Sequence, residues 1–145
     1  MKNSSQMDYV QTIDYTPSED EEYLNEQQLR YFEYKLFRQK RELEEKIQIS
    51  IAKLKSLKAE SSDLIDKSNN EYEIELELKA VERNANLLSL SENALNRLKE
   101  GGFGYCIITG QAIGVKRLNI IPTTTMSVDA MRMFEQDRYE RYNSH

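Results

Sequence analysis

Two long segments of the chain repeat apolar residues at steps of three and four, with charged residues in between. The first repeat consists of Leu29, Phe32, Leu36, Leu43, Ile47, Leu54 and Leu57, and the second of Ile74, Leu78, Val81, Ala85, Leu88, Leu95 and Leu98. This spacing gathers the apolar residues on one side of a helix and is typical of paired helices. We therefore predict an antiparallel coiled coil whose helices are about 45–55 Å long.

Capping patterns predict where each of the paired helices begins. Asn25 is a suitable N-cap and has Gln28 three residues later, so the first helix should start near Asn25. Ser68 and Glu71 form the same pattern, which predicts that the second helix starts just after Ser68. Residues 61–68 are then left as the tip of the hairpin.

Few residues of the chain interrupt a helix. All five glycines lie at or beyond Gly101, and the two prolines are Pro17 and Pro122. The segment between Pro17 and Gly101 therefore contains no strong helix breaker, and Gly101 and Gly102 should end the second helix.

The C-terminal part of the chain has a different pattern. Tyr105–Ile108 and Leu118–Ile121 resemble short strands or extended segments around glycine turns. A last helix is predicted from near Ser127 to Tyr142. Its apolar stripe consists of Val128, Met131, Met133 and Phe134.

The block from Phe103 to Gly110 has the spacing of a zinc-finger knuckle without its ligands. A structural zinc site takes four nitrogen or sulfur ligands, usually from two CxxC pairs. The four positions with that spacing are Cys106, Thr109, Ser127 and Ala130. Because only Cys106 is a good zinc ligand, we expect no zinc. We expect packing by the apolar residues beside the former ligands, Ile107, Ile108 and Met126, to replace it.

These patterns divide the chain into three predicted parts. Residues 1–22 are polar and acidic and should form a flexible tail. Residues 23–101 should form the coiled-coil hairpin, and residues 102–145 a small α/β module, a degenerate zinc finger that ends in a helix. The predicted fold class is therefore mainly α.

Composition excludes several classes of function. A net charge of −5 and a pI near 5.1 argue against direct sequence-specific DNA binding. A single cysteine excludes an intrachain disulfide and fits a reducing cytosol. No apolar run approaches the roughly 20 residues of a membrane span, so we expect a soluble, cytoplasmic protein. No nucleophile–base pair, phosphate-binding loop or metal cluster indicates an enzyme.

One ordered set of residues runs from Tyr23 to the C-terminal helix. It comprises Tyr23, Asn25-Glu26, Gln28-Leu29 and Phe32, then Asp63-Leu64-Ile65-Asp66, then Glu71, Glu73, Leu76-Glu77-Leu78 and Arg83, and finally Phe103-Gly104-Tyr105-Cys106, Ile113-Gly114, Arg117-Leu118 and Pro122-Thr123. In this order and spacing the chain resembles the DksA/TraR family of bacterial RNA polymerase-binding transcription factors.

The resemblance implies a mechanism and a partner. Members of this family insert their coiled coil through the secondary channel of RNA polymerase and destabilise promoter open complexes, in a stringent-response-type role. Asp63 and Asp66 match the family's two tip aspartates, and Ser68 matches its small residue nearby. Arg83 matches the arginine that contacts the polymerase rim. The chain should act by protein contact. Self-association through the apolar seams stays open as an alternative, but an intramolecular hairpin should be a monomer.

Members of the family often act together with the alarmone ppGpp, but this chain differs from the family at the residues of that shared site. The family's basic residues at that site fall on Leu90, Ile121 and Met131, and none of these side chains can pair with a phosphate. Lys116 or Arg132 could substitute from nearby. We expect at most a weak effect of ppGpp.

Other interpretations of the same residues remain open. Two tip carboxylates can bind Mg²⁺, which would suit Gre-like stimulation of transcript cleavage. The chain could instead be a structural coiled-coil adaptor that has lost polymerase binding. An Asp-x-x-Asp before a helix is often only a cap, and an arginine on a coil surface is often solvated or paired with an acid one turn away.

Overall fold

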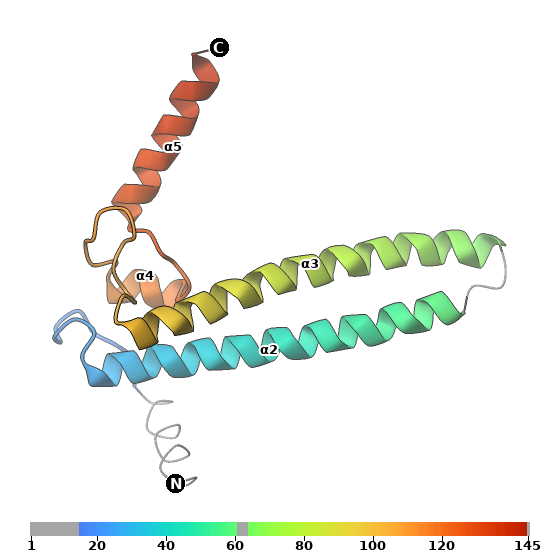
Figure 1. Ribbon diagram of the computed structural model, residues 1–145, viewed down its shortest axis with the longest axis horizontal. Coiled ribbons are helices and arrows are strands. Elements are labelled where there is room, and N and C mark those ends of the chain that lie inside the picture. Colours follow the sequence, from blue (N-terminus) through green and yellow to red (C-terminus); the bar gives the residue numbers. More distant parts are fainter. Residues whose placement is uncertain (1–14, 61–63, 145) are drawn as a thin grey trace, which may run out of the picture. The chain divides into compact units, whose positions relative to one another are not determined.

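A computed structural model describes residues 15–60 and 64–144, and these residues are mostly helical (Figure 1). The helices in this part of the chain are α2 (Glu26–Ala59), α3 (Leu64–Glu100), α4 (Val115–Ile120) and α5 (Val128–Asn143). The strand-like pairing found there is one isolated antiparallel bridge between Tyr105 and Ala112. None of the helices described has both the length and the apolar character needed to cross a membrane.

The described residues pack into two compact units. The first, which we call the helix-pair unit, is Phe37–Glu92 and contains most of α2 and α3. The second, which we call the module unit, contains residues 15–36 and 93–144.

The start of α2 is capped as the sequence predicts. The side-chain Oδ1 of Asn25 accepts a hydrogen bond from the backbone N–H of Gln28 at 2.8 Å. The Gln28 Oε1 accepts from the backbone N–H of Leu24 at 2.7 Å, one residue earlier than a standard capping box would have it. The Gln28 Nε2 also donates to the carbonyl of Ser18 at 3.3 Å. The described end of the expected tail is thus hydrogen-bonded to the first turn of α2.

The start of α3 differs from the prediction. The helix begins at Leu64, so Ser68 lies inside it rather than at its N-cap, and residues 64–68 are helical rather than a loop. The segment from Leu64 to Glu71 contains neither glycine nor proline. Since nothing in this segment stops a helix, a favourable capping pattern was not sufficient to fix the boundary.

The end of α3 confirms the prediction for the two glycines. Gly101 adopts a left-handed φ of 86°, and the N–H of Gly102 donates to the carbonyl of Arg97 at 3.0 Å. This is the bond of a Schellman motif that spans five residues, and it satisfies a carbonyl at the helix end.

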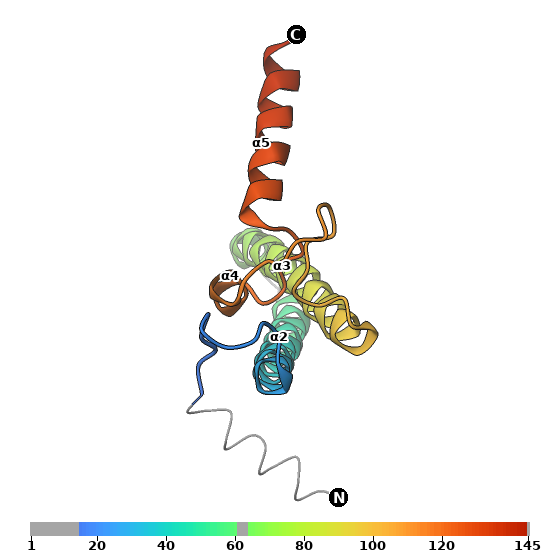
Figure 2. The same cartoon turned by 90° about the vertical axis from the view of Figure 1, so that its left-hand side faces the viewer.

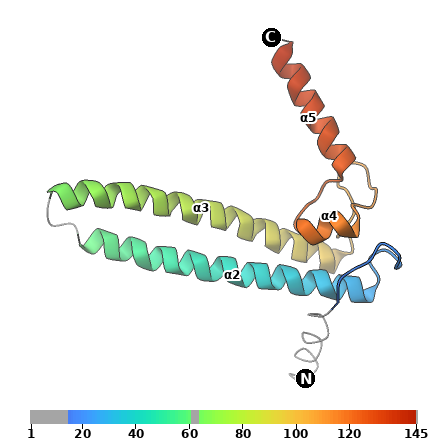
Figure 3. The same ribbon diagram turned by 180° about the vertical axis from the view of Figure 1, so that it is seen from behind.

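In the helix-pair unit, α2 and α3 run antiparallel and side by side (Figures 1 and 3). Apart from Ala80, the α3 positions that are buried or half-buried here follow a seven-residue repeat with steps of four and three: Asn70, Ile74, Glu77, Val81, Asn84, Leu88 and Ser91. The predicted seam members Leu78 and Ala85 are wrong, since both are exposed and Leu78 retains 51% of its accessible surface. Every second seam position on α3 is polar, which is why a search for apolar residues chose the wrong neighbour.

Two of the polar seam positions, Glu77 and Asn70, are hydrogen-bonded to α2. The Glu77 carboxylate accepts a hydrogen bond from Ser50 of α2, which lowers the pKa of Glu77 below its ordinary value, and Lys53 adds to this effect. The Lys53 Nζ lies 3.5 Å from the Glu77 carboxylate. Nearer the end of the pair, the Asn70 Nδ2 donates to the carbonyl of Leu57 at 3.2 Å.

The module unit has a small apolar core where α2 begins and α3 ends. The buried members are Phe32, Leu36, Ala94, Leu95, Phe103, Val115 and Leu118. The rings of Phe32 and Phe103 lie 5.6 Å apart. Figure 2 shows α4 beside these helix ends, and Tyr31 and Lys35 of α2 both donate to Asn119 of α4.

The predicted strand at Leu118–Ile121 is wrong, because residues 118–120 belong to α4. Val115 and Leu118 lie three residues apart and both are buried, which is the pattern of a short helix with one face on the core. The start of α5 is confirmed: Ser127 is its N-cap and accepts a hydrogen bond from the Ala130 N–H. The predicted apolar stripe of α5 is exposed, since Ala130 is the one buried residue of this helix.

Candidate functional site

The four positions with zinc-finger spacing come together in the module unit. Cys106 is buried, with 3% of its surface accessible. A hydrogen bond from the Thr109 side chain lowers the pKa of Cys106 to about 6, with help from backbone N–H groups of Ser127, Thr109 and Ile108. The N–H of Ile107 donates to the carbonyl of Thr125 at 2.9 Å, which joins the first pair of positions to the second.

These residues do not fit zinc. The Ser127 hydroxyl is used as the N-cap of α5, at 3.2 Å from the Ala130 N–H, and the Ala130 methyl group is fully buried. A tetrahedral site needs four donors, and here one thiol is available. In the part of the chain that the structure describes, no three His, Cys, Asp or Glu side chains gather to hold a metal.

The expectation that Ile107 and Ile108 replace the metal by packing is wrong. Both side chains are exposed, Ile107 by 62% and Ile108 by 51%. Hydrogen bonds connect the two former pairs instead. A further hydrogen bond, from the Arg117 Nε to the carbonyl of Met126 at 3.0 Å, joins α4 to the residue before Ser127.

The residues predicted at the hairpin tip are only partly described. Asp63 lies outside the described residues. Asp66 and Ser68 belong to the first turns of α3, which begins at Leu64.

Arg83 is exposed on α3 and lacks the acidic neighbours that would explain it as a surface ion pair. The residues three and four positions away are Lys79, Ala80, Asn86 and Leu87. Among the described residues, the ion pairs found do not include Arg83. Sequence reasoning missed that four exposed apolar side chains flank it on α3: Tyr72, Leu76, Leu87 and Leu90. A second search for apolar pairs three or four residues apart, outside the seam, would have found them.

The three positions that match the family's ppGpp residues are all exposed apolar side chains. Leu90 is in the helix-pair unit, and Ile121 and Met131 are in the module unit. Lys116 and Arg132 are the basic residues that could substitute for them. The Lys116 Nζ lies 3.6 Å from the Glu19 carboxylate, with which it forms an ion pair. Arg132 is exposed on α5.

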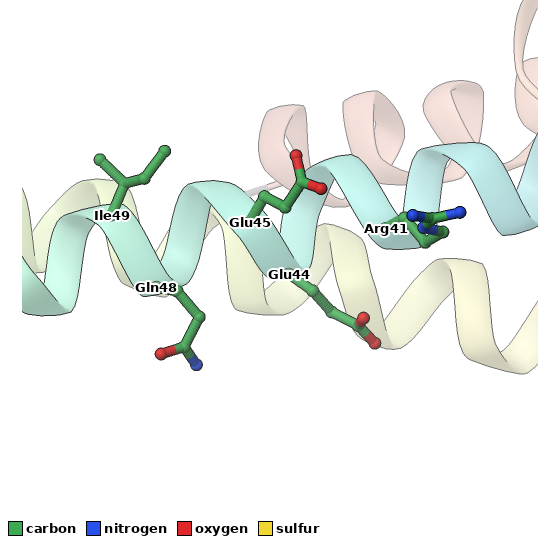
Figure 4. A pocket seen from close by; sticks show the side chains of 5 residues that line it. All are labelled: Arg41, Glu44, Glu45, Gln48 and Ile49. Carbon is green, nitrogen blue, oxygen red and sulfur yellow. The ribbon is translucent and has the colours of Figure 1, made fainter.

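A hollow of about 430 Å³ lies on α2. Figure 4 shows the side chains that line it. All its lining residues come from that single helix: Arg41, Glu44, Glu45, Gln48 and Ile49. Side chains from one helix face do not converge around a ligand, so this hollow has none of the enclosure expected of a small-molecule site.

Comparison with known proteins decides the family. Residues 28–98 match the family described as "DnaK suppressor protein DksA, N-terminal domain". The RNA polymerase-binding transcription factor DksA of Caulobacter vibrioides is 39% identical over 132 residues, which cover 91% of this chain and 89% of that protein. The chain belongs to the DksA family. The DksA of Escherichia coli K12 is 30% identical over 121 residues, covering 83% of this chain and 80% of its own length.

A solved structure in the DksA family supports the fold. Transcription factor DksA2 from Pseudomonas aeruginosa aligns with a TM-score of 0.73 and 30% identity, covering 96% of this chain and 99% of DksA2. The predicted mainly α fold, with a coiled-coil hairpin and a C-terminal helix, is thereby confirmed.

Proposed function

We propose that this chain binds bacterial RNA polymerase and regulates transcription. The observation that carries the proposal is the match to relatives named RNA polymerase-binding transcription factors, which spans 89% of the Caulobacter protein. Because these relatives are named as transcription factors, the proposal assigns the chain a role in binding rather than in catalysis.

The proposed mechanism acts through the end of the helix pair. The 34 residues of α2 give that helix a length of about 50 Å, enough to reach down a narrow channel. Asp63 and Asp66 would then bring two negative charges close to the catalytic centre, where the polymerase holds Mg²⁺ and nucleic-acid phosphates. Carboxylates there compete for the metal and repel phosphates, which destabilises the open complex.

We propose further that the module keeps its fold without zinc and that ppGpp has little effect on how the protein acts on polymerase. The hydrogen bonds around Cys106, Thr109 and Ser127 support the first part, since they already connect the segments that zinc would join. Leu90, Ile121 and Met131 support the second part, because apolar side chains offer a phosphate no hydrogen bond.

The decisive experiment measures polymerase binding and the lifetime of open complexes at a ribosomal promoter. We expect the wild type to shorten the lifetime, and Asp66→Asn to bind with unchanged affinity but to lose this effect. Glu60→Gln removes an exposed carboxylate next to the tip and serves as the matched control, which should behave as wild type.

Two results would contradict the proposal. If the wild type does not bind polymerase, the chain is an adaptor with another partner. If the wild type binds but stimulates cleavage of RNA in stalled complexes, the Gre-like mechanism is correct instead.

A further inference from the structure

Helix α5 exposes nearly all of its side chains. It runs for 16 residues from Val128 to Asn143, and Ala130 is its one buried residue. Most of the stability of a helix in a protein comes from packing, and a helix of this length is marginal without it. The large apolar side chains of α5 retain between 39% (Met131) and 83% (Tyr142) of their accessible surface. A partner that covered them would therefore stabilise α5.

Five residues of α5 have the spacing of a coiled-coil seam. They are Val128, Met131, Glu135, Arg138 and Tyr142. Their steps of three, four, three and four residues place them on one side of the helix, which we call the α5 seam. The seam is about 21 Å long at a rise of about 1.5 Å per residue. All five side chains are exposed, so the seam is accessible to a partner.

The two central residues of the α5 seam carry opposite charges. The ion pairs found among the described residues include neither Glu135 nor Arg138. In a parallel pair of two α5 helices, Glu135 would face Glu135 and Arg138 would face Arg138. Like charges held opposite one another disfavour that arrangement. In an antiparallel pair, Glu135 of each copy instead faces Arg138 of the other.

The apolar members of the α5 seam fit the same antiparallel register. When position 135 faces position 138 of a second copy, position 131 faces position 142. Met131 then packs on the ring of Tyr142 at each end of the contact, and contacts between a thioether and an aromatic ring are favourable. A single register therefore matches the charges and the apolar side chains at once.

The two flanks of the α5 seam also complement themselves. Arg132 and Tyr139 lie on one flank, and Phe134 and Arg141 lie on the other. A two-fold axis between antiparallel helices brings each flank against the same flank of the second copy. Arg132 then lies near Tyr139 of the other copy, and Arg141 lies near its Phe134. Both contacts place a guanidinium beside an aromatic ring, which is an attractive arrangement.

We propose that α5 is a self-association surface, which pairs with α5 of a second copy of the chain as a two-fold antiparallel coiled coil. Two pairs of Glu135 with Arg138 lie at its centre, and contacts of Met131 with Tyr142 lie at its ends. A polar pair in a coiled-coil seam fixes register and orientation at a cost in stability. The proposal goes beyond polymerase binding and does not depend on it.

The size of the contact predicts a weak dimer. Each copy contributes three aromatic side chains, Phe134, Tyr139 and Tyr142, which are 50–83% exposed in the single chain. An aromatic side chain buries about 150–250 Å² when it is fully covered, so six of them bury on the order of 1,000 Å² in all. This area is at the lower end of specific interfaces, and we expect a Kd on the order of 10–100 μM.

The test is sedimentation of the full-length chain, from about tenfold below to about tenfold above the expected Kd. Glu135→Arg sets arginine against arginine in the pair, and Arg138→Glu sets glutamate against glutamate. Each should raise the Kd of the dimer at least about tenfold. An equimolar mixture of the two variants should dimerise again, because every arginine of one chain then faces a glutamate of the other.

Two further variants control for overall charge and for damage to the helix. Glu140→Arg changes the net charge as Glu135→Arg does, but on the opposite side of α5, and should dimerise within about twofold of wild type. Glu135→Arg/Arg138→Glu exchanges the two central charges and should dimerise as wild type does. Glutamate and arginine are both good helix formers, so circular dichroism should show unchanged helix content.

Three results would overturn the proposal. A wild type that stays monomeric over the whole range of concentration shows that α5 does not pair. If both single variants dimerise like wild type, another surface joins the two copies. If the mixture and the charge-exchanged variant stay monomeric with unchanged helix content, the antiparallel register is wrong.

Discussion

Gly104 shows how one residue connects the start of the chain to its C-terminal module. Its φ of 85° is left-handed, and a Cβ there would meet the side chains of Leu24 and Tyr23. The Tyr23 hydroxyl donates to the carbonyl of Gly104 at 2.5 Å and accepts from the N–H of Gly114 at 3.1 Å. Gly104 is therefore needed both for its backbone conformation and for the space it leaves.

We predict that Gly104→Ala destabilises the protein more than Gly110→Ala, as measured by urea unfolding. Gly110 is also left-handed, at 73°, but has open space around it. Its substitution should cost about 1–2 kcal/mol from the backbone alone. Gly104→Ala adds a clash with Leu24, for which overpacking suggests roughly 1–3 kcal/mol more. Equal losses in the two variants would show that the contact with Leu24 does not matter.

The lowered pKa of Cys106 predicts a dependence of stability on pH. An acidic group whose pKa falls from 9.0 to about 6 on folding stabilises the folded state fully above pH 9. This contribution decreases as the pH falls and is lost below about pH 6. Wild type should therefore gain stability between pH 6 and pH 9 relative to Cys106→Ala, as measured by urea unfolding at both values.

Thr109→Val provides the matched test, because it removes the largest cause of the low pKa and keeps the size of the side chain. Its thiol should titrate at higher pH, which thiolate absorbance in the ultraviolet can follow. A Thr109→Val protein that titrates like wild type would assign the shift to the backbone N–H groups instead.

Residue-level predictions succeeded where the cause was local. Asn25, Gly101 and Ser127 were predicted correctly as helix ends, because a cap depends on the few residues next to it. The bond from Tyr23 to Gly104 joins residues 81 positions apart, and no pattern near either residue indicates it. The exposure of Ile107 and Ile108 likewise depends on packing that the sequence does not display.

At the scale of elements, the helix pair combines a correct prediction with an incorrect register. Pairing follows from periodicity, which the sequence states directly. The choice of Leu78 over Glu77 failed because the seam of α3 carries Asn70, Glu77, Asn84 and Ser91 at one of its two repeating positions. Hydrophobicity alone cannot recognise a polar seam whose groups find partners across the pair, as Glu77 does with Ser50.

We predict that Glu77→Leu raises the urea midpoint of the protein but allows it to self-associate. A carboxylate in a helix seam is commonly less stabilising than an apolar residue of similar size, while it disfavours other pairings. Glu75→Leu, two residues away and exposed, is the matched control and should leave the midpoint nearly unchanged. Sedimentation reports association, and a lower midpoint for Glu77→Leu would show that the bonds to Ser50 and Lys53 outweigh apolar packing.

We predict that a zinc site can be restored in the module unit by substitution. Because positions 106, 109, 127 and 130 are connected in space, Thr109→Cys/Ser127→Cys/Ala130→Cys should bind one zinc ion and gain thermal stability from it. Wild type should contain no zinc after purification and should not change its melting temperature when EDTA is added. Tightly bound zinc in the wild type, measured by mass spectrometry, would contradict the zinc-free module.

At the scale of the whole molecule, the order of parts was predictable and the tip was not. The sequence order of helix, return helix and module agrees with the DksA fold. Asp66 and Ser68 were predicted in a loop, but α3 begins at Leu64 and includes both. The segment contains no helix breaker, so the helix extends through it. The proposed roles of Asp63, Asp66 and Arg83 stay predictions, since a role in a complex depends on the partner's surface as well.

The response to ppGpp tests how the whole protein acts with polymerase. We predict that ppGpp changes the open-complex lifetime measured with this protein by less than about twofold, since a ligand shifts an equilibrium only through differential contacts. Leu90, Ile121 and Met131 are exposed, so Leu90→Lys/Ile121→Lys/Met131→Lys introduces three cations without disturbing a core. This variant should respond to ppGpp more strongly than wild type. A wild-type response as large as that of the variant would mean that Lys116 or Arg132 already supplies the missing charge.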